Sequence, residues 1–158
     1  MRRRRDAPQA WSAFALVKIT GKTEPSFPAL AEMFHKSKNQ GHRHEALLAL
    51  VELGPDARAA LPVLIKALKE KGERESFGRD SRYEAARALV HFGPEAKEAV
   101  PYLIDMVETS YFMAKIAAAE ALGAIGPAAK DAIPALEKMT TEDSRYQPVV
   151  EKALARIR

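Results

Sequence analysis

The strongest constraint on the fold is that one stretch of sequence occurs three times. Each copy contains a Gly-Pro pair, and a second proline follows seven residues after the first one. The spacings between the pairs are 39 and 33 residues. Periods of this length are typical of repeat proteins, in which each unit packs only against its neighbours. The three pairs are Gly54-Pro55, Gly93-Pro94 and Gly126-Pro127.

The similarity extends well beyond the glycine and proline positions. Residues 45–64, 84–103 and 117–136 align without gaps, and residues 15–30 form a degenerate earlier copy in which Thr20-Gly21 replaces Gly-Pro. The sequence from Ala153 to Ile157 matches the first half of a further copy. We therefore expect a basic segment at 1–9 that is flexible, followed by one domain at 10–158. Its repeats are expected at about 10–38, 43–71, 82–108 and 115–140, with a half repeat at 147–158.

One copy has the pattern of a helical hairpin. In its first half, Ala46, Ala49, Leu50 and Leu53 have the spacing of one helix face, which predicts a helix A. Gly54 follows at the position where a helix commonly ends with a positive φ. Apolar residues from 61 to 68 resume the helical period and predict a helix B, with Pro62 either in its first turn or at a kink in an earlier start.

Small residues recur on helix A, where alanine occupies equivalent positions in three copies. One hairpin cannot bury both of its faces, so the copies must stack and share their core. With 47% hydrophobic and 29% charged residues, the composition is that of a folded chain. We predict an all-α fold, a right-handed alpha-alpha solenoid of about four helical hairpins plus a C-terminal half repeat.

The shared motif Leu-Gly-Pro-x-Ala-x-x-Ala-Leu-Pro-x-Leu at 53–64, with near copies at 92–103 and 125–136, resembles the short HEAT repeats of the phycobilisome-lyase type. The resemblance covers most of residues 10–157, and no ankyrin or tetratricopeptide signature is present. The family's basic residue before helix A is matched by Arg43, Arg82 and Lys115, whereas Gln9 and Gln147 depart from it. The resemblance implies a binding scaffold or an accessory subunit of bilin lyases.

The net charge of +4 does not indicate a nucleic-acid groove. Four of the 25 basic residues are Arg2 to Arg5, so the remaining 21 balance the 21 acidic residues. The arginine run is a separate appendage, either a solvated terminus or an anchor for RNA or anionic lipid. The absence of cysteine indicates a reducing compartment, and we expect a cytoplasmic protein. The longest apolar run near the start, 13–17, is too short for a signal peptide, and no membrane span is expected.

One cluster, His42-Arg-His44-Glu45, has the residue types of a metal site. His44 and Glu45 resemble the iron-binding pairs of HEAT-fold deoxyhypusine hydroxylases, but the equivalent positions in the next copies hold Tyr83-Glu84 and Ile116-Ala117. Neighbouring residues on a helix point about 100° apart, so the pair alone cannot enclose a metal. His35 and His91 are isolated, and no catalytic set is recognisable. We expect no catalytic, metal or cofactor site and no enzyme activity.

HEAT-like folds also include DNA-alkylation glycosylases, which read damaged duplexes with cationic and aromatic residues. Here Trp11 is the sole tryptophan, and it lies in the first predicted helix. The outward row on helix B alternates in sign, which favours ion pairs between repeats over a phosphate track. This row is Glu32, Lys66, Asp105 and Lys138. A second row could be a methionine stripe for a partner helix, although gap filling between helices is favoured; it contains Met33, Ala67, Met106 and Met139.

These observations favour a non-catalytic protein-protein interaction scaffold that binds an unidentified protein or peptide on its concave helix-B face. The alternatives are a bilin-lyase-like or other enzyme-accessory subunit, and nucleic-acid binding through Arg2 to Arg5, against which the neutral body argues. We expect a monomer or weak self-association through the terminal repeats. The segment 71–82 contains an insertion of about six residues, which explains the longer spacing. It is either a tolerated loop or a binding element with Phe77 as its apolar anchor. The predicted binding residues are Tyr102, Met106, Asp105, Lys66, Val63 and Phe77.

Overall fold

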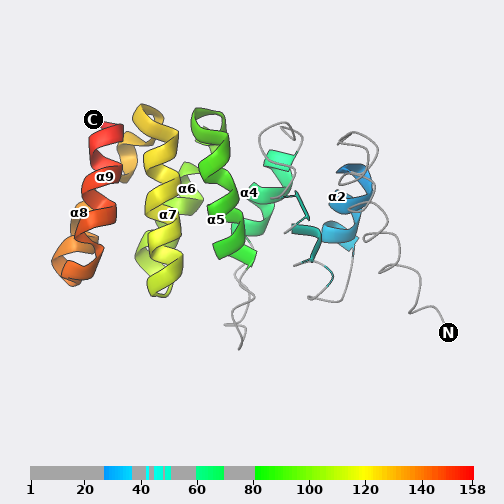
Figure 1. Ribbon diagram of the computed structural model, residues 1–158, viewed down its shortest axis with the longest axis horizontal. Coiled ribbons are helices and arrows are strands. Elements are labelled where there is room, and N and C mark those ends of the chain that lie inside the picture. Colours follow the sequence, from blue (N-terminus) through cyan, green and yellow to red (C-terminus); the bar gives the residue numbers. More distant parts are fainter. Residues whose placement is uncertain (1–26, 37–41, 43–44, 48, 51–59, 70–80) are drawn as a thin grey trace.

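The computed structural model describes residues 27–36, 42, 45–47, 49–50, 60–69 and 81–158. These residues form helices and their connections, and the described part contains no β-strand. The helices stand side by side along the long axis of the molecule, in chain order from one end to the other (Figure 1). This arrangement confirms the prediction of an all-α solenoid.

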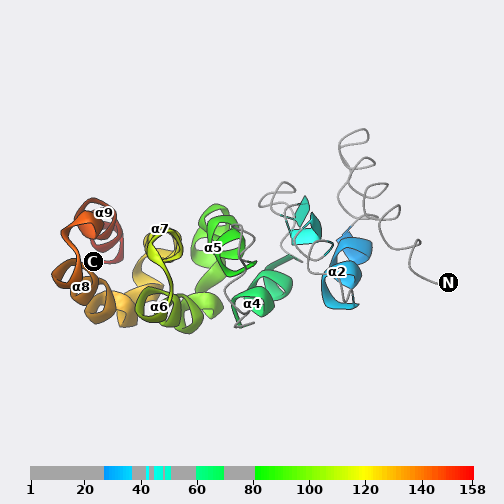
Figure 2. The ribbon, with the colours of Figure 1, turned by 90° about the horizontal axis from the view of Figure 1, so that it is seen from below.

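The helices form two layers that correspond to the two halves of the repeat (Figure 2). The A layer contains α5 (Ser81–Phe92), α7 (Phe112–Ile125) and α9 (Gln147–Ile157). The B layer contains α2 (Phe27–Lys36), α4 (Leu61–Lys69), α6 (Val100–Thr109) and α8 (Ile133–Glu142). The 3₁₀ segments η3 (Gly93–Ala99) and η4 (Gly126–Ala132) lead from the A layer to the B layer, and η5 (Ser144–Tyr146) leads from α8 to α9.

The Gly-Pro pairs mark the ends of the A helices. Gly93 and Gly126 have φ values of 53° and 73°, a region that side chains disfavour, whereas Gly54 lies outside the described residues. The chain leaves helical geometry again at Ala96 and Ala129, and α6 and α8 begin soon afterwards. The second proline of the repeat is therefore in the first turn of helix B, as the second residue of α4, α6 and α8. A residue in the first turn of a helix needs no backbone N–H donor, so proline fits there. The other possibility, a proline that kinks an earlier start of helix B, is not observed.

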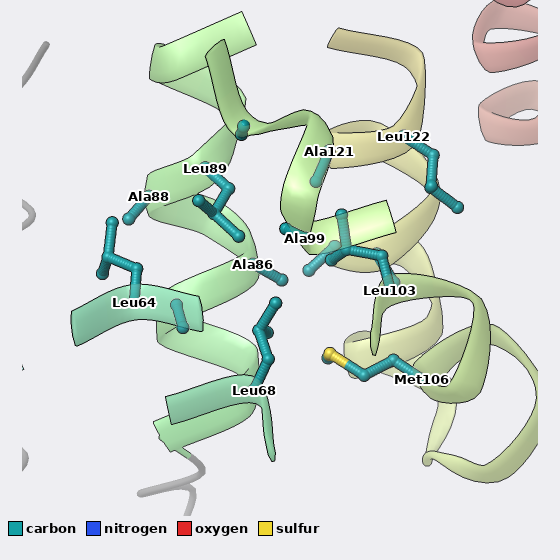
Figure 3. Packing of buried hydrophobic residues seen from close by; sticks show 14 of the residues in the cluster. Leu64, Leu68, Ala86, Ala88, Leu89, Ala99, Leu103, Met106, Ala121 and Leu122 are labelled. Carbon is teal, nitrogen blue, oxygen red and sulfur yellow. The ribbon is translucent and has the colours of Figure 1, made fainter. Parts of the chain in front are cut away.

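The core runs without interruption through successive repeats. Leucines of three successive helices are almost completely buried between the A and B layers (Figure 3). They are Leu64 and Leu68 of α4, Leu89 of α5 and Leu103 of α6. Alanines cover the faces where A helices meet, and their small side chains allow a close approach. The equivalent alanines, each at most 1% exposed, are Ala85, Ala88, Ala118 and Ala121.

A close approach in the A layer joins α7 to α9. A Cβ atom placed on Gly123 would lie 2.8 Å from the Cα atom and 3.1 Å from the Cβ atom of Ala153. Val150 and Ile157 are buried on the same face of α9, while Glu151 and Lys152 are exposed on the other face. The last helix therefore covers the core with one apolar side and presents charge outward.

The stretch Phe112–Glu142 has the length and the composition of a membrane-spanning helix, with a mean hydropathy of 1.2. It is α7, η4 and α8 together, which turn back on one another at Gly126, and 56% of its most apolar part is buried inside the protein. Its hydropathy therefore comes from the core of the solenoid, where its alanines and leucines are buried. Such a core helix is weak evidence for a membrane span.

Candidate interaction surface

The accessible surfaces of α4 and α6 carry apolar and charged side chains from two successive repeats. Lys66 and Lys69 are exposed on α4, and Tyr102, Ile104 and Asp105 are half-buried on α6. We call these residues, together with the half-buried Ile65, the α4–α6 face. The spacing of Ile65 and Lys69 places them on one side of α4. Tyr102 and Ile104 are two residues apart and therefore point to nearly opposite sides of α6.

A direct contact joins the two repeats on this face. The Nζ atom of Lys69 lies over the ring of Tyr102, at 4.8 Å from the ring centroid. Ammonium groups are attracted to the negative face of an aromatic ring at this distance. The contact fixes the position of the tyrosine ring relative to the lysine, although α5 and η3 lie between the two residues in the sequence.

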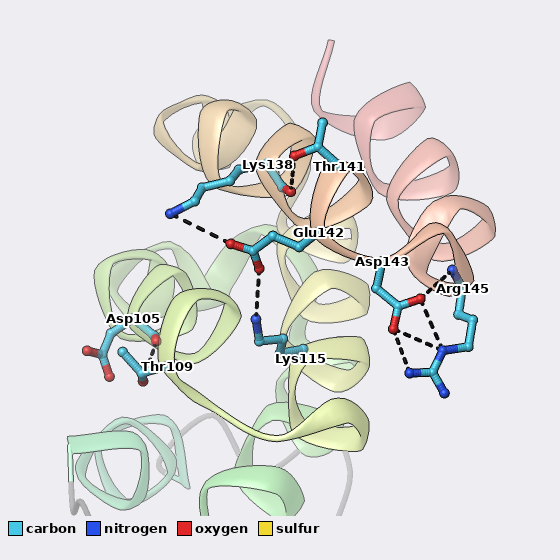
Figure 4. A network of polar contacts seen from close by, with 8 residues as sticks. All are labelled: Asp105, Thr109, Lys115, Lys138, Thr141, Glu142, Asp143 and Arg145. Atoms are coloured by element: carbon cyan, nitrogen blue, oxygen red, sulfur yellow. Dashed lines mark hydrogen bonds and ion pairs between the residues drawn. The ribbon is translucent and has the colours of Figure 1, made fainter.

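Asp105 is held from the A layer. Arg82, in the first turn of α5, donates from Nη2 to the Oδ2 atom of Asp105 at 2.6 Å, and the side chains are 11% and 34% exposed. The next repeat has a related bond, in which Lys115 of α7 donates to Glu142 at 3.4 Å (Figure 4). The basic residue at the start of helix A thus ties that helix to helix B of the same repeat.

Two residues that we predicted on this surface are in the core instead. Met106 is 0% exposed and Val63 is 3% exposed, so the prediction of accessible side chains is wrong for both. Both belong to the hydrophobic core, where neighbouring B helices pack side by side. The same packing buries the other members of the methionine row, which supports gap filling: Met33, Ala67 and Met139 are at most 8% exposed.

The remaining predicted residues fall into two groups. Lys66, Tyr102 and Asp105 lie at the surface of adjacent B helices, whereas Phe77 lies outside the described residues. Of the row predicted to form ion pairs between repeats, Glu32 pairs with Lys36 within its own helix.

Lys138 pairs in the same way with Glu142, one turn further along α8. Asp105 bonds to Arg82 inside its own repeat. These three members of the row are thus paired within a helix or a hairpin, and helical spacing alone could not distinguish these partners from the next repeat.

A second cluster, which the sequence analysis missed, lies where α7 and α9 begin. The ring of Phe112 stacks on Tyr146, with centroids 4.9 Å apart, and the guanidinium of Arg145 lies 4.6 Å from the Phe112 centroid. Asp143 accepts hydrogen bonds from Arg145 at 2.6 to 3.0 Å (Figure 4). The hydrogen bonds from Arg145 lower the pKa of Asp143, and burial raises the pKa of Tyr146.

Two large apolar side chains are exposed beside this cluster, with Tyr111 at 42% and Met113 at 48%. The signal in the sequence was an aromatic residue at the start of a helix A in two successive repeats, with Phe112 as the first residue of α7 and Tyr146 just before α9. The signal is weak because these positions are not equivalent in the repeat alignment. The stacking of Phe112 on Tyr146 connects the start of α7 to the start of α9.

The residues suspected of metal binding are only partly described. Glu45 is exposed, while His44 lies outside the described residues. Within the part of the chain that the structure describes, no group of three or more histidine, aspartate or glutamate side chains could hold a metal ion. The described contacts of the candidate surface are thus apolar contacts, ion pairs and cation–π contacts.

Comparisons with known families agree with the repeat architecture. The family model of HEAT repeats matches residues 74–156, which include α5 to α9 except for the last residue of α9. The family model of the PBS lyase HEAT-like repeat matches residues 43–70, which include α4. A comparison with curated proteins gives no match.

Proposed function

Because the chain belongs to the HEAT-repeat family, whose repeats generally serve as protein-interaction scaffolds, we propose that it is a non-catalytic scaffold that binds a partner protein through the α4–α6 face. Stacked repeats present side chains from successive units on one surface. Such a surface can hold an extended or helical segment of another protein.

The contact between Lys69 and Tyr102 is the observation that carries this proposal. It places a large aromatic side chain, half-buried, at the junction of two repeats. Tyrosine supplies apolar area and a polar tip with few rotatable bonds, and it is enriched among residues that dominate binding energy. Its ring is already held by the lysine, so little further ordering is needed on binding.

The test is the affinity of a purified partner, first captured with the whole chain and then titrated against variants. Tyr102→Ala should weaken binding by more than about 1 kcal/mol, which corresponds to roughly fivefold. Lys138→Ala is the matched control, because Lys138 lies on α8, outside the α4–α6 face, and should change the affinity little.

Circular dichroism must show that both variants keep the helical fold. An unchanged affinity for folded Tyr102→Ala would remove the α4–α6 face from the proposal. The start of α7 would then be the place to look, with Tyr111 and Met113, which are the large apolar side chains exposed among the residues that the structure describes.

A second candidate function is support of bilin attachment, which the match of residues 43–70 to the PBS lyase HEAT-like repeat favours. In this case the solenoid would hold a tetrapyrrole or its acceptor protein. Co-expression with a bilin source should then give a purified protein with visible absorbance, and a colourless product would count against this candidate.

A further inference from the structure

The charge on the α4–α6 face is unevenly divided between its two helices. The nine residues of α4 include Lys66 and Lys69 and no acidic residue. On α6 the carboxylate of Asp105 already bonds to Arg82 at 2.6 Å. Among the described residues of this face, α4 therefore contributes cations and no carboxylate, and the carboxylate of Asp105 on α6 is already paired.

Three other acidic residues described in the B layer are paired with cations of the protein. The pairs are Glu32 with Lys36 at 2.7 Å, Glu137 with Arg158 at 2.6 Å, and Glu142 with Lys115 at 3.4 Å and Lys138 at 3.8 Å. Lys69 differs from these cations, because its described contact is with the ring of Tyr102. A ring face does not neutralise an ammonium group, and the remaining N–H bonds can still donate to a carboxylate.

Apolar area lies directly beside this cation. Ile65 is half-buried and lies one turn before Lys69 on α4, and the ring of Tyr102 lies against Lys69 from α6. Ile65 and Tyr102 thus form an apolar strip from two repeats beside the Lys69 ammonium.

Glu108 sets the orientation of a charged ligand. It has the register on α6 that Lys69 has on α4, and it is exposed at the last turn. A carboxylate would be repelled from the α6 end and attracted to the α4 end of the same strip. The face therefore distinguishes one direction of an approaching chain from the other.

We infer that the partner presents an acidic segment, in which a carboxylate binds the Lys69 ammonium while adjoining apolar side chains cover Ile65 and Tyr102. This inference rests on the proposed function, since it names the chemistry of the segment that the α4–α6 face takes. Charge complementarity of this kind gives direction and selectivity, and the apolar strip supplies the buried area.

The experiment is a titration of the isotope-labelled whole chain with two synthetic peptides, followed by nuclear magnetic resonance. The first peptide alternates aspartate with leucine and phenylalanine, and the second has asparagine in place of each aspartate. The acidic peptide should shift the amide signals of α4 and α6 and bind at least about fivefold more tightly than the asparagine peptide. Lys69→Gln should remove this preference, and Lys69→Arg should retain it because the charge remains.

Lys138→Gln is the control, because it removes a positive charge of the B layer outside the α4–α6 face. Equal binding of the two peptides, no binding of the acidic peptide, or shifts confined to other helices would overturn the inference. If both peptides bind equally and Tyr102→Ala weakens both, the face still binds proteins and only its acidic preference is wrong. If Tyr102→Ala weakens neither peptide nor the natural partner, the proposed function itself fails at this face.

Discussion

Replacing Gly123 by alanine adds only one methyl group, yet it should push α7 and α9 apart. An alanine Cβ atom there would lie 2.8 Å from the Cα atom of Ala153, and non-bonded carbon atoms prefer about 3.5 to 4.0 Å. The blocking atom belongs to the backbone of α9, so a change of side-chain rotamer cannot relieve the clash. The helix α9 would have to retreat by roughly 0.7 Å, which loosens the packing of Val150 and Ile157.

Two opposing terms set the size of the effect. Overpacking of a well-packed core costs about 1 to 3 kcal/mol, whereas Gly→Ala inside a helix gains about 1 kcal/mol from helix propensity. We therefore expect Gly123→Ala to lower the free energy of unfolding by about 1 kcal/mol. Gly123→Val should cost about 3 kcal/mol, although valine is the residue at the equivalent positions 51 and 90 of two other copies.

Urea unfolding and hydrogen exchange measure this prediction together, because the terminal helix of a solenoid can open before the rest. Amides of α9 should exchange faster in Gly123→Ala, with a smaller change in α5. Ala155→Val is the control, since Ala155 is on the exposed face of α9. A gain of about 1 kcal/mol for Gly123→Ala, as propensity alone would give, would refute the close approach of α7 and α9.

Three further outcomes follow from the described contacts. Arg82→Met should lower the free energy of unfolding by about 1 to 2 kcal/mol in urea, because it leaves the part-buried carboxylate of Asp105 without this 2.6 Å partner; a change below the measurement error would show that the bond is not stabilising. Gly126→Ala should cost about 1 to 3 kcal/mol, because φ is 73° there, and an unchanged unfolding midpoint would contradict that backbone geometry. Burial raises the pKa of Tyr146 above its ordinary value of 10.0, so its stabilising contribution is complete below about pH 10 and is lost as the pH rises through the folded-state value. Tyr146→Phe should reduce this alkaline loss, as measured by unfolding at a series of pH values, and an identical pH profile would assign the loss to other groups.

The main features of the fold could be predicted because they depend on local geometry. The Gly-Pro pairs require a helix end wherever they occur, and Gly93 and Gly126 show the positive φ that this requires. The spacing of Ala85, Ala88 and Leu89 identifies a buried face on any helix, and all three are at most 1% exposed. These inferences use only the period of one helix and the chemistry of its end.

The candidate surface was harder to predict, because it depends on how far neighbouring helices cover one another. Met106 and Tyr102 are one helical turn apart on α6, yet the lateral contact between B helices buries the methionine fully and the tyrosine only in part. The partners of Asp105 and Lys69 come from other helices, and their choice depends on side-chain reach. The repeat alignment places equivalent residues in rows, but it does not say which row is covered.

The most direct test of the central claim is the exchange footprint of the whole chain bound to its purified partner. Backbone amides of α4 and α6 should become protected from hydrogen exchange on binding, while those of the exposed face of α9 should not change. Tyr102→Ala should reduce this protection at the same partner concentration. Protection confined to α5, α7 and α9, with α4 and α6 unchanged, would contradict the assignment of the α4–α6 face as the binding surface.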